Sequence, residues 1–319
     1  MEIGSFIELQ FPKGREFYND HQNTARLNSG RAAIYHAIRL LGCNTVWLPY
    51  YQCESVRKFL LKKGVAIKYY RINENFEPIG IEPKDAEAVV VVNYFGIMSN
   101  NRMRALTQNF EKVIVDNSQA FFCDPLEKCF NVYSPRKFIG VPDGAYVIGT
   151  GAKQFLQQYA RCYSSETAGF LLSRVEYGCE GKTYEMRCAN ESRIDREDIM
   201  QMSALTRCIL DGTDYEFIIS KRRKNFQFAR KLFDGINQLD VSKYFDQSTV
   251  PMVYPLVVED DLLLERLIEH KHFQGHWWSY ILQEVPTDCF EYWLSRYMIP
   301  ITIDQRYGEK ELEYIRSLV

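Results

Sequence analysis

The chain has 319 residues, 46% of them hydrophobic and 25% charged, with 39 Lys and Arg against 41 Asp and Glu. This composition is typical of a globular protein and excludes disorder, collagen or a coiled coil as a description of the whole chain. A net charge of −2 gives no strong field that would draw the chain to nucleic acid or an anionic membrane. We therefore expect neither among its partners.

The cysteines and the N-terminus indicate the compartment. Nine cysteines are scattered without a Cys-x-x-Cys pair, which favours reduced thiols. No run of 18 apolar residues predicts a membrane span, and the first ten residues lack the apolar core of a secretory signal. The spacing of His270, His272 and His276 does not place three ligands on one helical face, so we expect no metal site. The sequence predicts a cytoplasmic protein.

The first 163 residues alternate between helical and strand patterns. A helix is expected from Ser29 to Leu41, where apolar residues recur at helical spacing, and another from Ser55 to Lys63. Further helices are expected over about 102–110 and 153–163. The expected strands are Val46–Leu48, Ala66–Ile72, Ala88–Val92, Val113–Val115 and Gly144–Ile148. Such alternation predicts an α/β fold with a mostly parallel sheet and helices on both faces.

The second half of the chain has a different pattern. Residues 163–196 are polar and lack periodicity, so a long loop or lid is expected there. Helices follow over 198–210 and 215–239, then two strands at 253–258 and 297–303 on either side of a helix at 262–270, and a last helix at 309–318. We therefore predict a large α/β domain over residues 1–213 and a small α+β domain over 214–319.

Three features of the first half could carry chemistry. The Ser29-Gly30-Arg31 helix start could bind an anion such as phosphate, although Ser29 is also an ordinary helix cap. Asp116 ends a buried apolar strand, where a carboxylate is either functional or a cap for the next segment. Lys137 lies in a loop of Gly and Pro and could act as a nucleophile, although most lysines are simply exposed.

The order of these features resembles that of fold-type I pyridoxal 5′-phosphate (PLP) enzymes, and more narrowly the DegT/DnrJ/EryC1/StrS family of sugar aminotransferases. The chain looks like a short, divergent member of that family. The motifs that carry the resemblance are Leu27–Ala33, Trp47–Tyr51, Asn93–Gly96, Asp116–Gln119 and Lys137 with Asp143–Ala145. The resemblance implies a PLP-binding α/β domain followed by a smaller C-terminal domain.

The resemblance also implies residue roles. Lys137 would bind the cofactor covalently and then move a proton, and Asp116 would pair with the pyridine nitrogen. Gln119 would hydrogen-bond the 3′-oxygen. The implied phosphate ligands are Ser29, Gly30 and Arg31, through their backbone N–H groups, and Ser134. Cys53 stands where family members often carry the aromatic residue that stacks on the ring, so Tyr50 or Tyr51 could take that role.

The implied activity is a homodimeric aminotransferase. It would move an amino group from an amino acid, glutamate in our expectation, to a nucleotide-linked keto-sugar for surface glycan or polysaccharide biosynthesis. A PLP-dependent sugar dehydratase is one alternative, but family dehydratases replace the lysine by histidine, and Lys137 is present. The other alternative is a PLP-binding or scaffold protein without turnover. It is favoured by Cys53, by Ile199 in place of a family asparagine, and by a shortened segment between 149 and 202.

Overall fold

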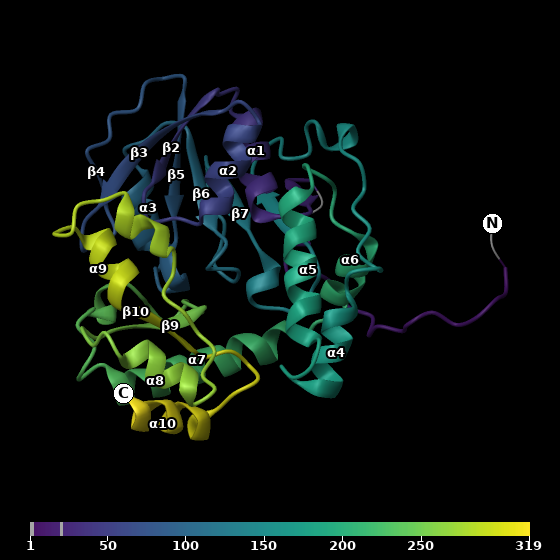
Figure 1. The fold of residues 1–319 in the computed structure, drawn as a ribbon. Coiled ribbons are helices and arrows are strands. Elements are labelled where there is room, and N and C mark those ends of the chain that lie inside the picture. The colour runs from purple at the N-terminus through teal and green to yellow at the C-terminus, as the bar shows by residue number, and fades with distance from the viewer. Residues whose placement is uncertain (1–2, 20–21) are drawn as a thin grey trace.

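A computed structural model describes residues 3–19 and 22–319 of the chain (Figure 1). Eight strands form one sheet in the order β1-β8-β7-β6-β5-β2-β3-β4. The strands are β1 (Thr24–Leu27), β2 (Thr45–Pro49), β3 (Ala66–Ile72), β4 (Pro78–Ile79), β5 (Glu87–Val92), β6 (Val113–Asn117), β7 (Phe130–Tyr133) and β8 (Ala145–Ile148). The centre of the sheet is parallel, from β3 through β2, β5 and β6 to β7. The mostly parallel sheet is thus confirmed, with β1, β8 and β4 as antiparallel additions.

The central strands are buried because both faces of the sheet are covered. Every residue of β5, a run of four valines after Glu87 and Ala88, is buried, as expected of a strand in a parallel sheet. The three helices of this part are α1 (Gly30–Leu40), α2 (Glu54–Lys62) and α3 (Asn100–Thr107). Helix α1 starts where the Ser29 side chain caps it and packs across β6, β7 and β8. The start of α1 is thereby held against the strands that carry the candidate site.

The middle of the chain differs from the sequence prediction. The expected loop over 163–196 is wrong, because this stretch forms two helices, α4 (Gly169–Tyr177) and α5 (Thr183–Arg196). Helix α4 carries apolar residues but buries none of them, and α5 buries only three residues, so the pattern of a helix packed on a core is weak in this stretch. The helix expected over 153–163 is also wrong: only a short 3-10 turn forms, η3 (Leu156–Gln158). Phe155 has a left-handed conformation that ends any longer helix.

Helix α6 (Ala204–Asp211) begins six residues later than expected, because Ser203 caps it through a bond from the Thr206 N–H. Helix α7 (Tyr215–Phe233) then leads into the C-terminal part. Its remaining elements are β9 (Val253–Val257), α8 (Leu263–Glu269), α9 (Phe290–Tyr297), β10 (Met298–Thr302) and α10 (Glu309–Leu318). Strands β9 and β10 pair antiparallel in a sheet of their own. The division at residue 213 falls between α6 and α7 and stays a prediction.

Four short 3-10 turns complete the elements: η1 (Tyr94–Gly96), η2 (Pro135–Lys137), η4 (Val241–Lys243) and η5 (Ser279–Gln283). Two of them, η1 and η2, directly follow strands of the parallel sheet. Within residues 3–19 and 22–319, no helix is both long and apolar enough to cross a membrane. The same residues contain no group of three or more side chains that could hold a metal ion.

A buried glutamate joins the C-terminal part to the edge of the sheet. The Glu291 carboxylate in α9 is fully buried, accepts the Ile72 backbone N–H at 2.6 Å and accepts the Arg71 Nε at 3.0 Å. We expect Glu291→Ala to lower the free energy of unfolding by about 2–3 kcal/mol, since the buried Ile72 N–H loses its acceptor. Urea unfolding measures this. Glu269→Ala, on the exposed end of α8, is the control and should change little; equal effects would contradict the account.

Candidate functional site

Asp116 is the polar centre of the carboxyl edge of the sheet. It lies in β6, is 6% exposed, and has both carboxylate oxygens engaged. Its Oδ1 accepts the Ser118 backbone N–H at 3.0 Å, and its Oδ2 accepts Nε2 of Gln52 at 3.1 Å. The two donors come from the turn after β6 and from the segment after β2, so the carboxylate is fixed from two sides. The sequence reasoning missed Gln52, whose only signal is its position three residues after Pro49.

The start of helix α1 lies beside the turn that follows β6. A Cβ atom on Gly30 would stand 3.2 Å from the Ser118 hydroxyl, so glycine allows the helix start to approach the turn after β6 closely. Ser29 is buried and accepts the Ala32 N–H at 3.4 Å. The first N–H groups of a helix have no partner within the helix. The structure therefore brings the start of α1 next to Ser118, whose backbone N–H holds the Asp116 carboxylate.

The Arg31 side chain points elsewhere. Its guanidinium forms an ion pair with Asp195 and donates to the Ile194 carbonyl, both in α5. It also lies 5.6 Å from the centre of the Phe59 ring. Only the backbone N–H of Arg31 is therefore available to an anion at the helix start, and its side chain ties α1 to α5.

Lys137 follows β7, the neighbour of β6 in the sheet. Asn117 in β6 is in register with Tyr133 in β7, so the segments that carry Asp116 and Lys137 leave the sheet side by side. Lys137 is exposed, and no side-chain partner is found for it within the described residues. Ser134, between β7 and Lys137, is buried. The amino group is thus accessible to solvent in the single chain.

The C-terminal part holds the turn that carries Lys137. Arg222 of α7 is almost fully buried, and its guanidinium lies 4.6 Å from the centre of the Phe138 ring. Gln305, after β10, donates to the Phe138 carbonyl at 2.8 Å and accepts from the Arg222 Nε at 3.2 Å. Burial lowers the pKa of Arg222 to about 10. Two side chains distant in sequence therefore fix the residue next to Lys137.

The three residues considered for stacking on a cofactor ring have different neighbours. Tyr51 is fully buried, with its ring 4.5 Å from Trp278 in an edge-on arrangement, and burial raises its pKa. Tyr50 instead stacks on Tyr69 at 5.0 Å. The sulfur of Cys53, at the start of α2, lies 3.2 Å from the Ser55 hydroxyl. Which residue stacks on a cofactor ring stays a prediction.

Residues 277–280 lie at the same edge and are a further part of the site that the sequence analysis did not predict. Trp278 contacts Tyr51, and the Trp277 ring lies 5.6 Å from Phe95. The Tyr280 hydroxyl donates to the Gln52 carbonyl, so this segment also anchors the residue that holds Asp116. The C-terminal part therefore contacts the site in two places. Residues 277–280 contact the sheet edge, and Arg222 and Gln305 contact Phe138.

Gln119 fixes the turn after β5. Its Oε1 accepts the Phe95 N–H at 2.7 Å, and Phe95 has a left-handed backbone with φ of 60°. A Cβ on Gly96 would stand 2.2 Å from the Gln119 carbonyl oxygen, so only glycine fits there. The structure thus places Gln119 at this edge, directly after Ser118, whose backbone N–H binds Asp116.

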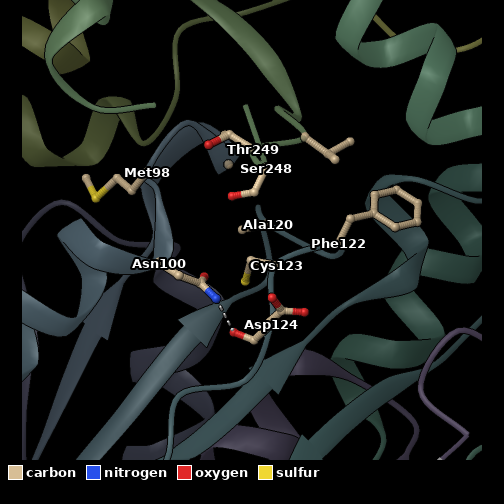
Figure 2. Close-up of a pocket in the computed structure, with 10 residues that line it drawn as sticks. Met98, Asn100, Ala120, Phe122, Cys123, Asp124, Ser248 and Thr249 are labelled. Atoms are coloured by element: carbon tan, nitrogen blue, oxygen red, sulfur yellow. Dashed lines mark hydrogen bonds between the residues drawn. The ribbon is translucent and has the colours of Figure 1, made fainter. Parts of the chain in front are cut away.

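A small pocket adjoins this turn (Figure 2). In Figure 2 the Cys123 sulfur and the Ser248 and Thr249 hydroxyls face the same space, and the Asn100 amide donates to the Asp124 carbonyl at 3.3 Å. The residues that line this pocket are Gly96, Met98, Asn100, Ala120, Phe122, Cys123, Asp124, Ser248, Thr249 and Val250. Burial raises the pKa of Cys123 to about 12, which leaves its thiol protonated and unreactive. None of the nine predicted site residues lines this pocket, so it neighbours the candidate site.

Three buried polar atoms near Asp116 have no partner within the described residues. They are Tyr51 Oη and Gln52 Oε1, just after β2, and Asn93 Oδ1, just after β5. A buried polar atom without a hydrogen bond is costly, and such groups in native proteins usually bind a ligand or water. Together with the free amine of Lys137, the Asp116 carboxylate and the start of α1, these atoms fit a polar cofactor with a ring nitrogen, an aldehyde and a phosphate.

Gly96 allows a direct test of this edge. We expect Gly96→Ala to destabilise the protein by about 2 kcal/mol more than Gly80→Ala, because both glycines have positive φ but only Gly96 would collide with backbone. At Gly80 a Cβ would meet nothing within 4 Å. The midpoints of urea unfolding for the two variants give the comparison. Equal destabilisation would show that the turn can move away from Gln119.

Comparison with known proteins indicates the fold. No model of a known family matches the sequence, and no curated protein matches it. Among solved structures, the sugar aminotransferase CalS13 from Micromonospora echinospora superposes with a TM-score of 0.62 at 16% identity, covering 92% of this chain and 86% of that one.

Two further structures agree. A DegT DnrJ EryC1 StrS aminotransferase from Brucella abortus has a TM-score of 0.60 at 11% identity, covering 92% of this chain and 84% of its own. The E. coli GDP-4-keto-6-deoxy-D-mannose-3-dehydratase with bound hydrated PLP has a TM-score of 0.60 at 13% identity, covering 92% and 87%. The chain therefore has the fold of the fold-type I PLP-dependent transferases, as its resemblance to the sugar aminotransferases predicts.

Proposed function

We propose that the chain is a PLP-dependent aminotransferase that acts on a keto-sugar. The observation that carries the proposal is the arrangement at one sheet edge of the Asp116 carboxylate, the start of α1 and the turn of Lys137. The unpartnered atoms beside Asp116 add support, because they offer bonds to a ligand. The similar structures favour the same cofactor and the same class of sugar substrate.

Each residue would have a distinct part. Ser29, Gly30 and Arg31 would bind the cofactor phosphate through backbone N–H groups, with Ser134 as a further ligand. Asp116, fixed by Gln52 and the Ser118 N–H, would hold the protonated ring nitrogen, and Gln119 would donate to the 3′-oxygen. Bound PLP supplies an electron sink that acidifies the carbon carrying the amino group. Lys137 would bind the aldehyde carbon and, once released, move the proton from the substrate carbon as a general base.

The remaining parts of the proposal rest on the resemblance. Glutamate would be the amino donor and a nucleotide-linked keto-sugar the acceptor, in the biosynthesis of a surface glycan or polysaccharide. The enzyme would be cytoplasmic and a homodimer. The exposure of Lys137 in one chain is consistent with a site completed by a second chain.

The dehydratase is the second candidate, because the E. coli dehydratase shares the fold. The presence of Lys137 favours the aminotransferase over the dehydratase, since the family dehydratases carry histidine at this position. The cofactor-binding scaffold without turnover is the third. Incubation with glutamate and 4-keto-sugar nucleotides distinguishes all three: an amino-sugar product supports the aminotransferase, a deoxygenated sugar the dehydratase, and no product despite bound PLP the scaffold.

Lys137→Ala tests the covalent role. We expect the purified chain to develop a visible absorption band with added PLP, and glutamate to convert that band to the pyridoxamine form. Lys137→Ala should lack the band, because the proposal assigns the covalent bond to the Lys137 amine. Lys153→Ala, at another exposed lysine, should retain it. A full band in Lys137→Ala would refute the assignment.

Gln52 tests the role of Asp116. We expect Gln52→Leu to weaken PLP binding by about tenfold, since a hydrogen bond to a charged group contributes about 1.5–3 kcal/mol. Gln52→Glu should weaken it further, because a second carboxylate would face Asp116. Fluorescence titration of the apoprotein with PLP measures both dissociation constants. Gln157→Leu, at an exposed glutamine, is the control, and equal affinities in all three variants would contradict the role.

A further inference from the structure

Helix α4 is apolar yet unburied. Its nine residues include Phe170, Leu171, Leu172, Val175 and Tyr177, and none of its residues is buried. Leu172 and Val175, one turn apart on the same face, are 64% and 86% exposed. A helix of a globular protein normally buries its apolar stripe, and large exposed apolar patches mark interaction surfaces. Helix α4 therefore presents a surface suited to a partner.

Helix α5 extends this surface. A Cβ on Gly169 would stand 2.8 Å from the Met186 methyl group, and the Ser173 and Thr183 hydroxyls are 2.5 Å apart, so α4 and α5 form a packed hairpin. Tyr184 and Met186 of α5 are both exposed. We call the exposed apolar residues Leu172, Val175, Tyr177, Tyr184 and Met186 the hairpin patch.

The N-terminal residues are the second unpartnered apolar segment. Ile3, Phe6, Ile7 and Leu9 are between 65% and 92% exposed, and residues 3–11, here called the arm, form no helix or strand. Figure 1 shows the arm running away from the body of the molecule. It is attached at the end of α6, where the Glu16 N–H donates to the Asp211 carboxylate at 3.1 Å. Fully extended, the nine residues of the arm span about 30 Å.

We propose that the arm of one chain packs on the hairpin patch of a second copy of this chain. Each copy carries one arm and one patch, so a two-fold symmetric pair uses both contacts twice. Each chain would contribute four large apolar side chains of its arm and five of its patch to the pair. The core of a homodimer interface is typically apolar in this way. The outward course of the arm favours a second copy over the chain's own hairpin.

The hairpin also borders the turn that carries Lys137. The Leu171 Cδ2 lies 3.6 Å from the position of a Cβ on Gly140, and Asn190 donates to the Pro142 carbonyl at 2.9 Å. Arg136 forms an ion pair with Glu191 of α5. A second copy seated on the hairpin would therefore pack against the element that supports the turn of Lys137. This specifies the surface of the proposed homodimer, and the pairing itself does not depend on PLP chemistry.

Light scattering after size-exclusion chromatography tests the pairing. We expect a dimer at micromolar concentration, and a dimer dissociation constant raised at least ~100-fold in either Phe6→Ser/Ile7→Ser or Leu172→Ser/Val175→Ser, as for loss of interface hot spots. Leu262→Ser, at an exposed leucine away from both surfaces, should leave the constant unchanged. A monomeric wild type, or arm and patch variants that dimerise as well as the control, would overturn the proposal.

Crosslinking identifies the contact itself. In a background with the exposed Cys179, Cys188 and Cys208 changed to Ser, chains with Ile7→Cys and chains with Val175→Cys are mixed and oxidised. We expect a disulfide-linked pair of one chain of each kind. If the arm instead packs on the hairpin of its own chain, the mixed chains would form no linked pair. A single chain that carries both substitutions would then crosslink internally, and the proposal fails. The PLP absorption band, recorded separately, shows whether the proposed function fails independently of the pairing.

Discussion

The buried carboxylate of Asp116 is the constraint around which the carboxyl edge of the sheet is arranged. A buried carboxylate must be hydrogen-bonded, and the donors here come from the turn after β6 and from Gln52 after β2. Gln52 is in turn anchored by Tyr280, and the turn after β6 is approached by α1 at Gly30. One charged group thus depends on both the parallel sheet and the C-terminal part of the chain.

The same two parts meet at Lys137. The strand order places the turn after β7 next to the turn after β6, and α7 and the segment after β10 hold the neighbouring Phe138 through Arg222 and Gln305. The amine itself remains exposed in one chain. In the account proposed here, the sheet positions the reactive groups and a second chain packs against α4 and α5, which support the turn of Lys137.

Much of this arrangement could be predicted from local sequence. The run Ala88–Val92 predicted a central strand because both of its faces are covered, and Ser29 predicted the start of α1 because its side chain caps the helix. The motif at Asp116 appears in sequence as a strand end, so its place at the carboxyl edge followed from parallel topology. Strand β7, which leads to Lys137, was not predicted, so the structure alone places Lys137 at the same edge.

The features that could not be predicted from local sequence depend on contacts between residues far apart in the chain. Helices α4 and α5 bury so few residues that the sequence pattern of a helix packed on a core is weak there. The hydrogen bond from Gln52 to Asp116 joins residues 64 apart in the chain. The contact of the Arg222 guanidinium with the Phe138 ring joins residues that are farther apart. The direction of the Arg31 side chain depends on Asp195, which no pattern near Arg31 indicates.

The central claim is that Lys137 is the amine that binds PLP, and the most direct test is to trap that bond. The chain is incubated with PLP, reduced with borohydride, digested and mapped by mass spectrometry. The account predicts one modified peptide, carrying the added mass on Lys137. Modification spread over exposed lysines such as Lys153, or none at all, would contradict it.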